Sequence, residues 1–509
     1  MFAMSIPILV GIVGHRNIAA DAVPEMEREL GQVLDRLGAE LPHTAIVVVS
    51  SLAEGADRLG ARLALARGLP LLVPLPFPLE QYERDFPNSV AEFRSLLAQA
   101  SDSFVISEQD CSGYEAAARW LSRHAQVVVA LWDGQDTESE AAPGGTAHTI
   151  RLRTLPGEAG HSLASVADYL GPTYHIDCPR QEPRTRQSPR WLSGSLPIPD
   201  WNGAINSLRP IERFNRSANP TPEPISTGLP AWTSLERVFR SADTLANQHQ
   251  KTHNRALGAT IVLAVAGYLL QGVAASFLGQ LSASLFFLLA LMTILLENKR
   301  HSYQIYLESR ALAEVLRVAI YWRLAGVTLS PTRYFLTQHW GELAWIRSAV
   351  KALWATAPRP APDLERVKSE WIDAQHHYYR RSTSRFGRLG HRFKLGSNIL
   401  FAFALGLAVL STVGSYFDVP YSELSSAFSG LLFLAASAAS YYLHTRGLEE
   451  DALRYAAMGQ TYGWVEELWA AASDADRQKV VVDLGNECIA ELSHWLLAHR
   501  SRPLEFMQN

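Results

Sequence analysis

Three short stretches in the first third of the chain place glycine, hydroxyl and charged side chains directly after apolar runs. They read GIVGHRN (residues 11–17), SSLAEGADRLG (residues 50–60) and LWDG followed by GGTAHTI (within residues 131–150). Glycine allows a backbone to approach a phosphate group, arginine can donate two hydrogen bonds to it, and the free amides that begin a helix attract anions. The three stretches therefore predict a pocket that binds a phosphate-bearing ligand.

Several side chains in these stretches have candidate roles. Arg16 is expected to contact phosphate and Glu54 to hold ribose hydroxyls, whereas for Asp57 a capping or surface role is an equal alternative. Trp132 is a candidate for base stacking, although tryptophan is more often part of a core. The acidic run QDTESEA (residues 135–141) is expected to form a flexible flap. The candidate ligand-binding residues are Gly14, His15, Arg16, Ser50, Ser51, Glu54, Gly55, Ala56, Asp57, Trp132, Gly144, Gly145 and Thr146.

The residues around these stretches alternate between strand-like and helix-like patterns. Apolar runs rich in β-branched residues are typical of strands that helices cover on both faces, and amphipathic stretches such as residues 23–41 and 56–67 separate them. The alternation predicts an α/β, Rossmann-like, doubly wound parallel sheet over residues 1–179, with the ligand at the carboxyl ends of the strands. The expected strands are residues 8–14, 45–51, 69–77, 126–132 and, as a shorter edge strand, 173–176.

The second half of the chain contains long apolar runs. Residues 256–296 include no Asp, Glu, Lys, Arg or His, and a helix needs about 20 residues to cross a bilayer. This run predicts two transmembrane helices, at about 256–275 and 278–296, and a second pair is expected at about 395–417 and 424–443. The sequence therefore predicts an all-α membrane domain with four transmembrane helices in two hairpins and long cytoplasmic helices.

Composition also indicates how the chain is divided. Residues 180–231 are rich in Pro, Arg and Ser and are expected to form a linker or a loosely packed extension. The two hairpins belong to successive units, residues 232–330 and 331–480, and a C-terminal cytoplasmic helix follows at 481–509. In each unit a cationic, histidine-rich helix precedes the hairpin and an amphipathic helix follows it, so a duplication is expected.

Basic residues flank the four predicted transmembrane helices, whereas the hairpin tips carry none. Five basic residues from Arg381 to Lys394 precede the third helix, and Lys299 and Arg300 follow the second. By the positive-inside rule these flanks face the cytoplasm and the tips face outward. We therefore expect a multi-pass protein of the inner (cytoplasmic) membrane whose N-terminus, C-terminus and α/β domain are cytoplasmic.

The composition of the whole chain argues against some function classes. The net charge of −4 over 509 residues predicts no nucleic-acid partner. Cys111, Cys178 and Cys488 show neither the spacing of a metal site nor a disulfide framework, which is typical of a reducing compartment. We expect no metal, no cofactor and no catalytic residue, but a nucleotide-type signalling ligand, the lipid bilayer and further copies of the chain as partners.

Some of these motifs resemble known families. GIVGHRN, SSLAEGADRLGARLALARGLPLLVPLPF and VVVALWDG with GGTAHTI resemble the SLOG superfamily, Rossmann-like domains that include LOG phosphoribohydrolases and sensor domains of bacterial conflict systems. The apolar hairpins with cationic helices resemble SLATT domains, which are two-helix membrane modules. The resemblance implies a SLOG domain that senses a nucleotide-derived second messenger and a SLATT region that forms a pore or disrupts the membrane, in anti-phage abortive defence.

The third stretch bears on whether the chain is an enzyme. LOG hydrolases carry Gly-Gly-x-Gly-Thr and a glutamate two residues after the threonine, whereas here Gly144 and Gly145 run directly into Thr146, and His148 takes the position of the glutamate. A carboxylate is needed to activate water or stabilise an oxocarbenium-like state. The sequence therefore favours binding over turnover. The alternatives are a membrane-tethered hydrolase of nucleotides or N-glycosidic bonds, and a constitutive ion channel or membrane scaffold.

Overall fold

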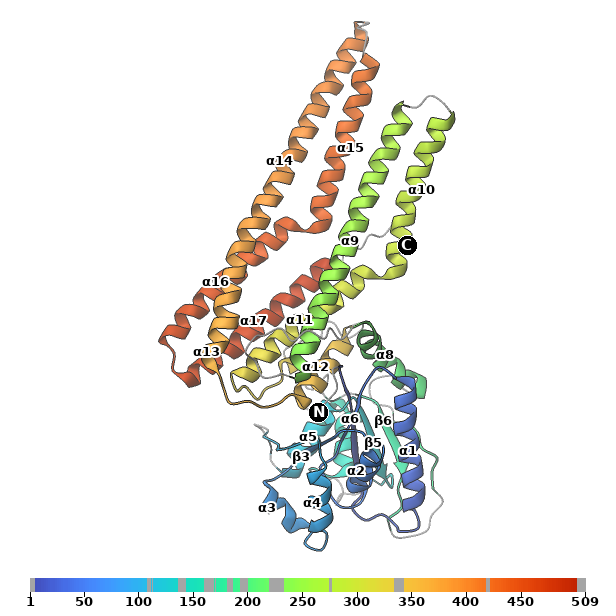
Figure 1. Ribbon diagram of the computed structural model, residues 1–509, viewed down its shortest axis with the longest axis vertical. Coiled ribbons are helices and arrows are strands. Elements are labelled where there is room, and N and C mark those ends of the chain that lie inside the picture. Colours follow the sequence, from blue (N-terminus) through green and yellow to red (C-terminus); the bar gives the residue numbers. More distant parts are fainter. Residues whose placement is uncertain are drawn as a thin grey trace. The chain divides into compact units, whose positions relative to one another are not determined.

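The chain divides into two units in the computed structural model (Figure 1). The sheet unit comprises Met1–Ala242, Ala311–Ala361 and Cys488–Ala490, and the helical unit comprises Asp243–Arg310, Pro362–Glu487 and Glu491–Asn509. The structure describes residues 5–107, 111, 113–135, 143–159, 169, 171–180, 186–192, 200–218, 233–273, 277–333, 343–417 and 422–500.

The sheet unit is built on a parallel-dominated sheet, as predicted. In the described residues the strands lie in the order β4-β3-β2-β1-β5-β6-β7, and every neighbouring pair is parallel except the antiparallel pair of β6 and β7. The strands are β1 (Ile8–Gly14), β2 (Ile46–Val49), β3 (Leu71–Leu75), β4 (Asp102–Val105), β5 (Val127–Trp132), β6 (Thr173–Asp177) and β7 (Arg190–Leu192). The sequence did not indicate β4, because its residues DSFV alternate between half-buried and exposed at the edge of the sheet.

Alternating residues of the central strand supply two cores, one on each face of the sheet. Ile8, Val10 and Ile12 are fully buried with one set of helices, while Leu9 and Val13 contribute to a second cluster on the other face. Helices therefore cover both faces, which explains why the strands are apolar on both sides. These helices include α1 (Val23–Glu40), α2 (Ala56–Ala66), α4 (Val90–Ala98), α5 (Gly113–His124) and α6 (Thr146–Thr154), and the short α3 (Leu79–Tyr82) adds Tyr82 to the first core.

Two further helices complete the layers, and both come from outside the range 1–179. Helix α8 (Trp201–Ser217) lies in the segment expected to be a linker or extension, and buries Ile205 and Leu208 in the first core. Helix α12 (Ala344–Thr356) lies in the part of the sequence assigned to the second membrane unit, but buries Ala352 and Ala355 in the second core. The sheet unit thus draws on segments more than 100 residues apart.

The helical unit contains the long apolar helices. Three segments are long and apolar enough to cross a membrane, Phe277–Arg300, Leu364–Tyr416 and Ser425–Ala471. They include the predicted transmembrane helix at 278–296 and all but one terminal residue of those at 395–417 and 424–443, and the length and composition of these helices are those of a membrane protein. The helices are α10 (Phe277–Arg300), α14 (Ala374–Tyr416), α15 (Ser422–Arg446), α16 (Leu448–Ala471) and α17 (Asp474–Arg500), together with the short α13 (Leu364–Val367).

The first predicted transmembrane helix, residues 256–275, is not among those three segments. Residues up to Val273 form the end of the long helix α9 (Thr233–Val273), and α11 (Ser302–Leu324) follows α10; both α9 and α11 run from one unit into the other. The Thr260 and Thr293 hydroxyls of α9 and α10 are hydrogen-bonded at 2.6 Å. The structure therefore pairs α9 with α10 without showing that both cross a membrane.

Helices α14 and α15 lie side by side (Figure 1), and small residues lie at their contact. The Ser397 hydroxyl donates to the carbonyl oxygen of Ala436 at 3.0 Å, and the Ser429 hydroxyl donates to that of Ala404 at 2.8 Å. Ala404 and Ala436 are buried, whereas large apolar side chains elsewhere on these helices are exposed. Small residues at the contact let two helix backbones approach closely, as in membrane hairpins.

Candidate functional site

The carboxyl ends of β1 and β5 meet at a change of direction in the sheet. From β1, the strands β2, β3 and β4 extend the sheet to one side, and β5, β6 and β7 extend it to the other. The loops that leave β1 and β5 therefore diverge, and a crevice forms between them, which is where doubly wound sheets bind ligands. A cavity of about 440 Å³ opens at this place.

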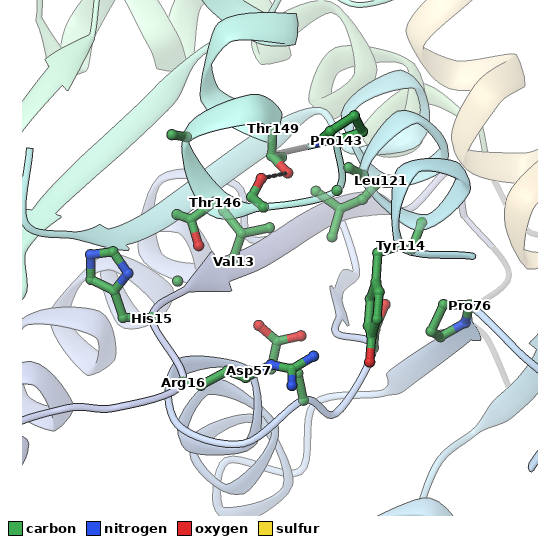
Figure 2. A pocket seen from close by; sticks show the side chains of 18 of the residues that line it. Val13, His15, Arg16, Asp57, Pro76, Tyr114, Leu121, Pro143, Thr146 and Thr149 are labelled. Carbon is green, nitrogen blue, oxygen red and sulfur yellow. Dashed lines mark hydrogen bonds between the residues drawn. The ribbon is translucent and has the colours of Figure 1, made fainter. Parts of the chain in front are cut away.

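All three stretches singled out in the sequence contribute to this cavity. Eight of the thirteen candidate residues line it, namely Gly14, His15, Arg16, Ser51, Asp57, Gly144, Gly145 and Thr146. The other five, Ser50, Glu54, Gly55, Ala56 and Trp132, are not among its lining residues. Residues that the sequence did not single out also line it, including Pro76, Tyr114, Leu121 and Thr149 (Figure 2). Tyr82 and Arg180 are further lining residues.

Two glycines allow the loops to fit against one another. Gly55 has a φ of +78°, and a Cβ atom there would lie 2.2 Å from the carbonyl oxygen of Arg16. Gly144 has a φ of +95°, and a Cβ atom there would lie 2.5 Å from the backbone of Tyr114. Both positions therefore require glycine, for conformation and for space. At these two positions glycine serves the packing of one loop on the next.

His15 is held by two charged neighbours. Nδ1 of His15 lies 2.8 Å from the guanidinium of Arg180, which can only donate, and Nε2 lies 3.0 Å from the backbone amide of Asp133 and 3.1 Å from its carboxylate. Burial lowers the pKa of His15, and Arg180 lowers it further, against the opposing effect of Asp133. The ring is neutral near pH 7, and both its nitrogens are engaged, so His15 shapes the wall of the cavity.

Arg16 stands next to Tyr114 and Asp57 at the centre of the cavity (Figure 2). Its guanidinium carbon lies 5.2 Å from the centre of the Tyr114 ring, within the range of a cation–π contact. The side chain is exposed, and among the described residues it forms no ion pair. Arg16 is therefore a cation available to a ligand.

The start of α6 faces the same cavity. Gly145 precedes the helix without a side-chain cap, and Gly145, Thr146 and Ala147 line the cavity. The first amides of a helix have no intrahelical partner and carry its positive dipole end. Arg16 and these amides together make this part of the cavity suited to an anion.

His148, at the position where a LOG hydrolase has glutamate, stabilises this turn. Its Nδ1 accepts a hydrogen bond from the backbone amide of Gly144 at 3.0 Å, and burial lowers its pKa. A neutral imidazole that accepts from the backbone has no carboxylate chemistry to offer. The local geometry thus supports the difference from the hydrolases that the sequence indicated.

Asp57 is the most perturbed acid of the cavity. It lies in the first turn of α2, is buried, and accepts hydrogen bonds from the backbone amides of Ser51 and Ala53. Burial raises its pKa to about 7, against the opposing effects of those amides and of the nearby Arg16. Its carboxyl group is therefore close to half-ionised at neutral pH.

The candidates that do not line the cavity stabilise its walls. The Ser89 hydroxyl donates to the carboxylate of Glu54, so that carboxylate is already engaged. The Ser50 hydroxyl donates to the carbonyl oxygen of Asp57 at 2.9 Å and joins the end of β2 to α2. Trp132 packs against the second core with its ring 5.6 Å from that of His175, as a core tryptophan does.

The lining residues that the sequence missed come from helices and from a strand on the other side of the cavity. Tyr82 ends α3, Tyr114 begins α5, and Arg180 follows β6. These residues reach the cavity only through the tertiary fold, so no local sequence motif could have identified them. The expected flap at 135–141 lies, apart from residue 135, outside the described residues.

Within the described part of the chain, no group of three or more His, Cys, Asp and Glu side chains is placed to hold a metal ion. The chain matches no protein-family model, no curated protein and no solved structure. Its function is therefore inferred from the cavity, the apolar helices and the sequence motifs.

Proposed function

We propose that the sheet unit binds a nucleotide-derived second messenger and that the helical unit is a membrane effector under its control. One observation carries the first part: three stretches of sequence, far apart in the chain and each of a type that binds phosphate, line the same cavity of about 440 Å³. A cavity of this size at the switch point of a parallel sheet is typical of a small-ligand site.

The lining of the cavity suits a nucleotide. Arg16 and the first amides of α6 offer an anion its counter-charge and hydrogen bonds. Tyr114 offers an aromatic face, and Ala117 and Leu121 offer an apolar wall. Phosphate and an aromatic base occur together in nucleotides, which explains why these two surfaces belong to one site.

The membrane topology that we propose has four transmembrane helices in two hairpins. Large apolar side chains such as Phe403 and Leu410 are about two-thirds exposed in the helical unit, as expected for side chains that contact lipid. Basic residues that flank the hairpins, among them Arg385 and Arg388, are exposed as well. With these flanks on the inside, both termini and the sheet unit are cytoplasmic at the inner membrane.

The effector action that we propose is the formation of a pore or the disruption of the membrane by several copies of the chain. The predicted transmembrane helices carry no ionisable side chain away from their ends, which argues against a pump or a proton relay. Four transmembrane helices enclose little space, so a pore requires oligomerisation. Because the motifs resemble SLOG and SLATT domains, we propose that this action serves anti-phage abortive defence.

Leakage from liposomes tests the proposal. The full chain in dye-loaded liposomes is exposed to extracts and to individual nucleotides, and dye release is followed. We expect release that depends on one nucleotide and is lost in Arg16→Ala, which removes the available cation, and in Gly145→Asp, which adds an anion at the start of α6. Glu54→Gln, outside the cavity, is the matched control and should behave like the unaltered chain.

Two results would count against the proposal. Equal leakage with and without every nucleotide would identify a constitutive channel. Nucleotide-dependent leakage that persists in both Arg16→Ala and Gly145→Asp would show that this cavity does not control the effector.

One observation favours a second candidate, a membrane-tethered hydrolase of nucleotides or N-glycosidic bonds. Asp57 lines the cavity with a pKa of about 7, and a carboxyl group that titrates near neutral pH is suited to general acid–base catalysis. Chromatography of the nucleotide after incubation distinguishes the two. A released base or sugar phosphate that disappears in Asp57→Asn would establish the hydrolase.

A further inference from the structure

Asp57 has hydrogen-bonding capacity that the fold does not use. Its carboxylate accepts from two backbone amides, those of Ser51 and Ala53, and it forms no ion pair among the described residues. An ionised carboxylate has about four acceptor positions. Since Asp57 lines the cavity (Figure 2), the remaining positions are open to a ligand.

Tyr82 is a second group of this kind on the same wall. It is fully buried, it lines the cavity, and its hydroxyl has no hydrogen-bond partner among the described residues. Burial and the nearby Asp57 both raise its pKa, so the hydroxyl keeps its proton. A buried hydroxyl without a partner costs free energy, and a polar ligand group that hydrogen-bonds to it offsets this cost.

The place of Asp57 in the cavity determines which part of a ligand it meets. Arg16 and the start of α6 serve the anion, and a carboxylate repels an anion. Asp57 therefore faces a part of the ligand that carries hydrogen-bond donors. In a nucleotide these are the hydroxyl groups of the sugar and the amino group of the base, and the sugar is the part that adjoins the phosphate.

We infer that Asp57 is the specificity-determining residue of this pocket and accepts a hydrogen bond from a sugar hydroxyl of the ligand, beside Tyr82. The ligand is thus a ribonucleotide and not a deoxy or dideoxy compound. This inference rests on the proposed nucleotide-binding function. It transfers to Asp57 the role that the sequence assigned to Glu54, whose carboxylate is bound by Ser89.

A comparison of hydroxylated and hydroxyl-free ligands tests this assignment. Binding of AMP, GMP, CMP and UMP to the full chain in detergent is measured by calorimetry, together with the corresponding 2′,3′-dideoxynucleotides. We expect at least one ribonucleotide to bind about 10- to 100-fold more tightly than its dideoxy form, the range for hydrogen bonds to a charged group. Asp57→Asn should reduce this preference to about threefold or less, and Glu54→Gln should leave it unchanged.

The outcomes separate this inference from the proposed function. Tight binding of a ribonucleotide and its dideoxy form alike overturns the role of Asp57 and leaves a nucleotide site in place. Failure of all these nucleotides to bind, with no phosphate compound co-purifying, overturns both.

Folding of the variants is controlled independently. The comparison of the two ligand series on the unaltered chain requires no substitution, and Tyr82→Phe removes a single oxygen atom from the same wall. A merely structural role of Asp57 predicts that Asp57→Asn lowers the affinity for both ligand series equally. Loss of the preference alone supports the inference.

Discussion

The two units of this protein place apolar and charged side chains in opposite ways. In the sheet unit, Leu9 and Ile12 are fully buried, and the charged Arg58 is buried with them because Glu92 and backbone carbonyls pair with it. In the helical unit, Phe403 is 67% exposed and Leu410 is 66% exposed. Water would penalise such exposure by about 25 cal/mol for each Å² of apolar surface. The two units are therefore adapted to different solvents, the sheet unit to water and the helical unit to lipid.

The largest expected effect concerns a buried charge of the sheet unit. Arg153 donates hydrogen bonds at 2.8–3.2 Å to the carbonyl oxygens of Ser122, Ala125, Gln126 and Pro172. Arg153→Met keeps most of the volume but removes the donor from all four carbonyls, of which that of Pro172 keeps a hydrogen bond from the backbone amide of Val128. We expect a loss of about 4 kcal/mol in the free energy of unfolding, or failure of the sheet unit to fold.

Urea unfolding followed by tryptophan fluorescence measures this loss. The matched control is Arg62→Met, because Arg62 is an exposed arginine paired with Glu92 at the surface, and it should cost less than about 0.5 kcal/mol. If the two variants were equally stable, the buried carbonyls would have found other partners.

A charged side chain introduced into the helical unit tests whether this unit is adapted to lipid. If Leu410 faces lipid, Leu410→Arg costs about 3 kcal/mol at the centre of a membrane-spanning helix, whereas an exposed site in water tolerates it at nearly no cost. Leu453 on α16 is at least as exposed, at 74%, but lies outside the predicted transmembrane helices. Membrane insertion, measured by carbonate extraction, should fall for Leu410→Arg and be retained for Leu453→Arg. Equal membrane insertion of the two variants would show that Leu410 and Leu453 do not lie in different solvents.

The pH dependence of Asp57 links stability to ligand binding within the sheet unit. Because the folded state raises the pKa of this carboxyl from 3.8 to about 7, it binds the proton more tightly than the unfolded chain does. The contribution of Asp57 to stability is therefore fully present below about pH 4 and is lost as the pH rises to about 7. The charged groups that face Asp57 are Arg16 after β1 and Arg58 on α2, and the neighbouring hydroxyl of Tyr82 on α3 stays neutral.

Asp57→Asn removes this titration. The variant should be more stable than the unaltered chain by about 4 kcal/mol at pH 8, and the two should converge near pH 4. Thermal unfolding of the full chain between pH 4 and pH 8 measures the difference. Ribonucleotide affinity should rise through pH 7 in the unaltered chain only, since the ionised carboxylate is the better acceptor. A stability difference that does not change with pH would show that Asp57 does not titrate in this range.

The sequence predicted the sheet better than the layers that cover it. β1, β2, β3 and β5 follow from buried, β-branched runs, whereas β4 alternates in polarity at an edge and gives no such signal. Helix α12 packs on strands such as β1 and β5, which lie more than 200 residues earlier in the chain, and the sequence of the helix does not indicate which surface it covers. Local periodicity predicts that a helix has an apolar face, but not what covers it.

The same limit applies to the cavity. Its three main stretches could be found because each follows a strand, and parallel strands end at one edge of the sheet. Glu54 and Asp57 are only three residues apart, yet Glu54 precedes the helix and binds Ser89, while Asp57 lies in the first turn and faces the cavity. That distinction depends on where the helix begins, which sequence patterns indicate only to within a few residues. Tyr82 and Tyr114 required the tertiary fold.

The smallest expected effect concerns how α14 and α15 associate. The Ser397 hydroxyl contacts the carbonyl oxygen of Ala436 and, at 2.7 Å, the hydroxyl of Ser440. In lipid, where apolar burial gives helices no driving force, such hydrogen bonds contribute about 0.6 kcal/mol each. Ser397→Ala should therefore destabilise the hairpin by about this amount in mixed micelles. Ser384→Ala, which removes a hydroxyl bonded only within its own helix to Arg380, should have no measurable effect. A cost above about 2 kcal/mol for Ser397→Ala would instead resemble a buried site of the sheet unit, and would indicate that this hairpin is packed as a water-soluble core.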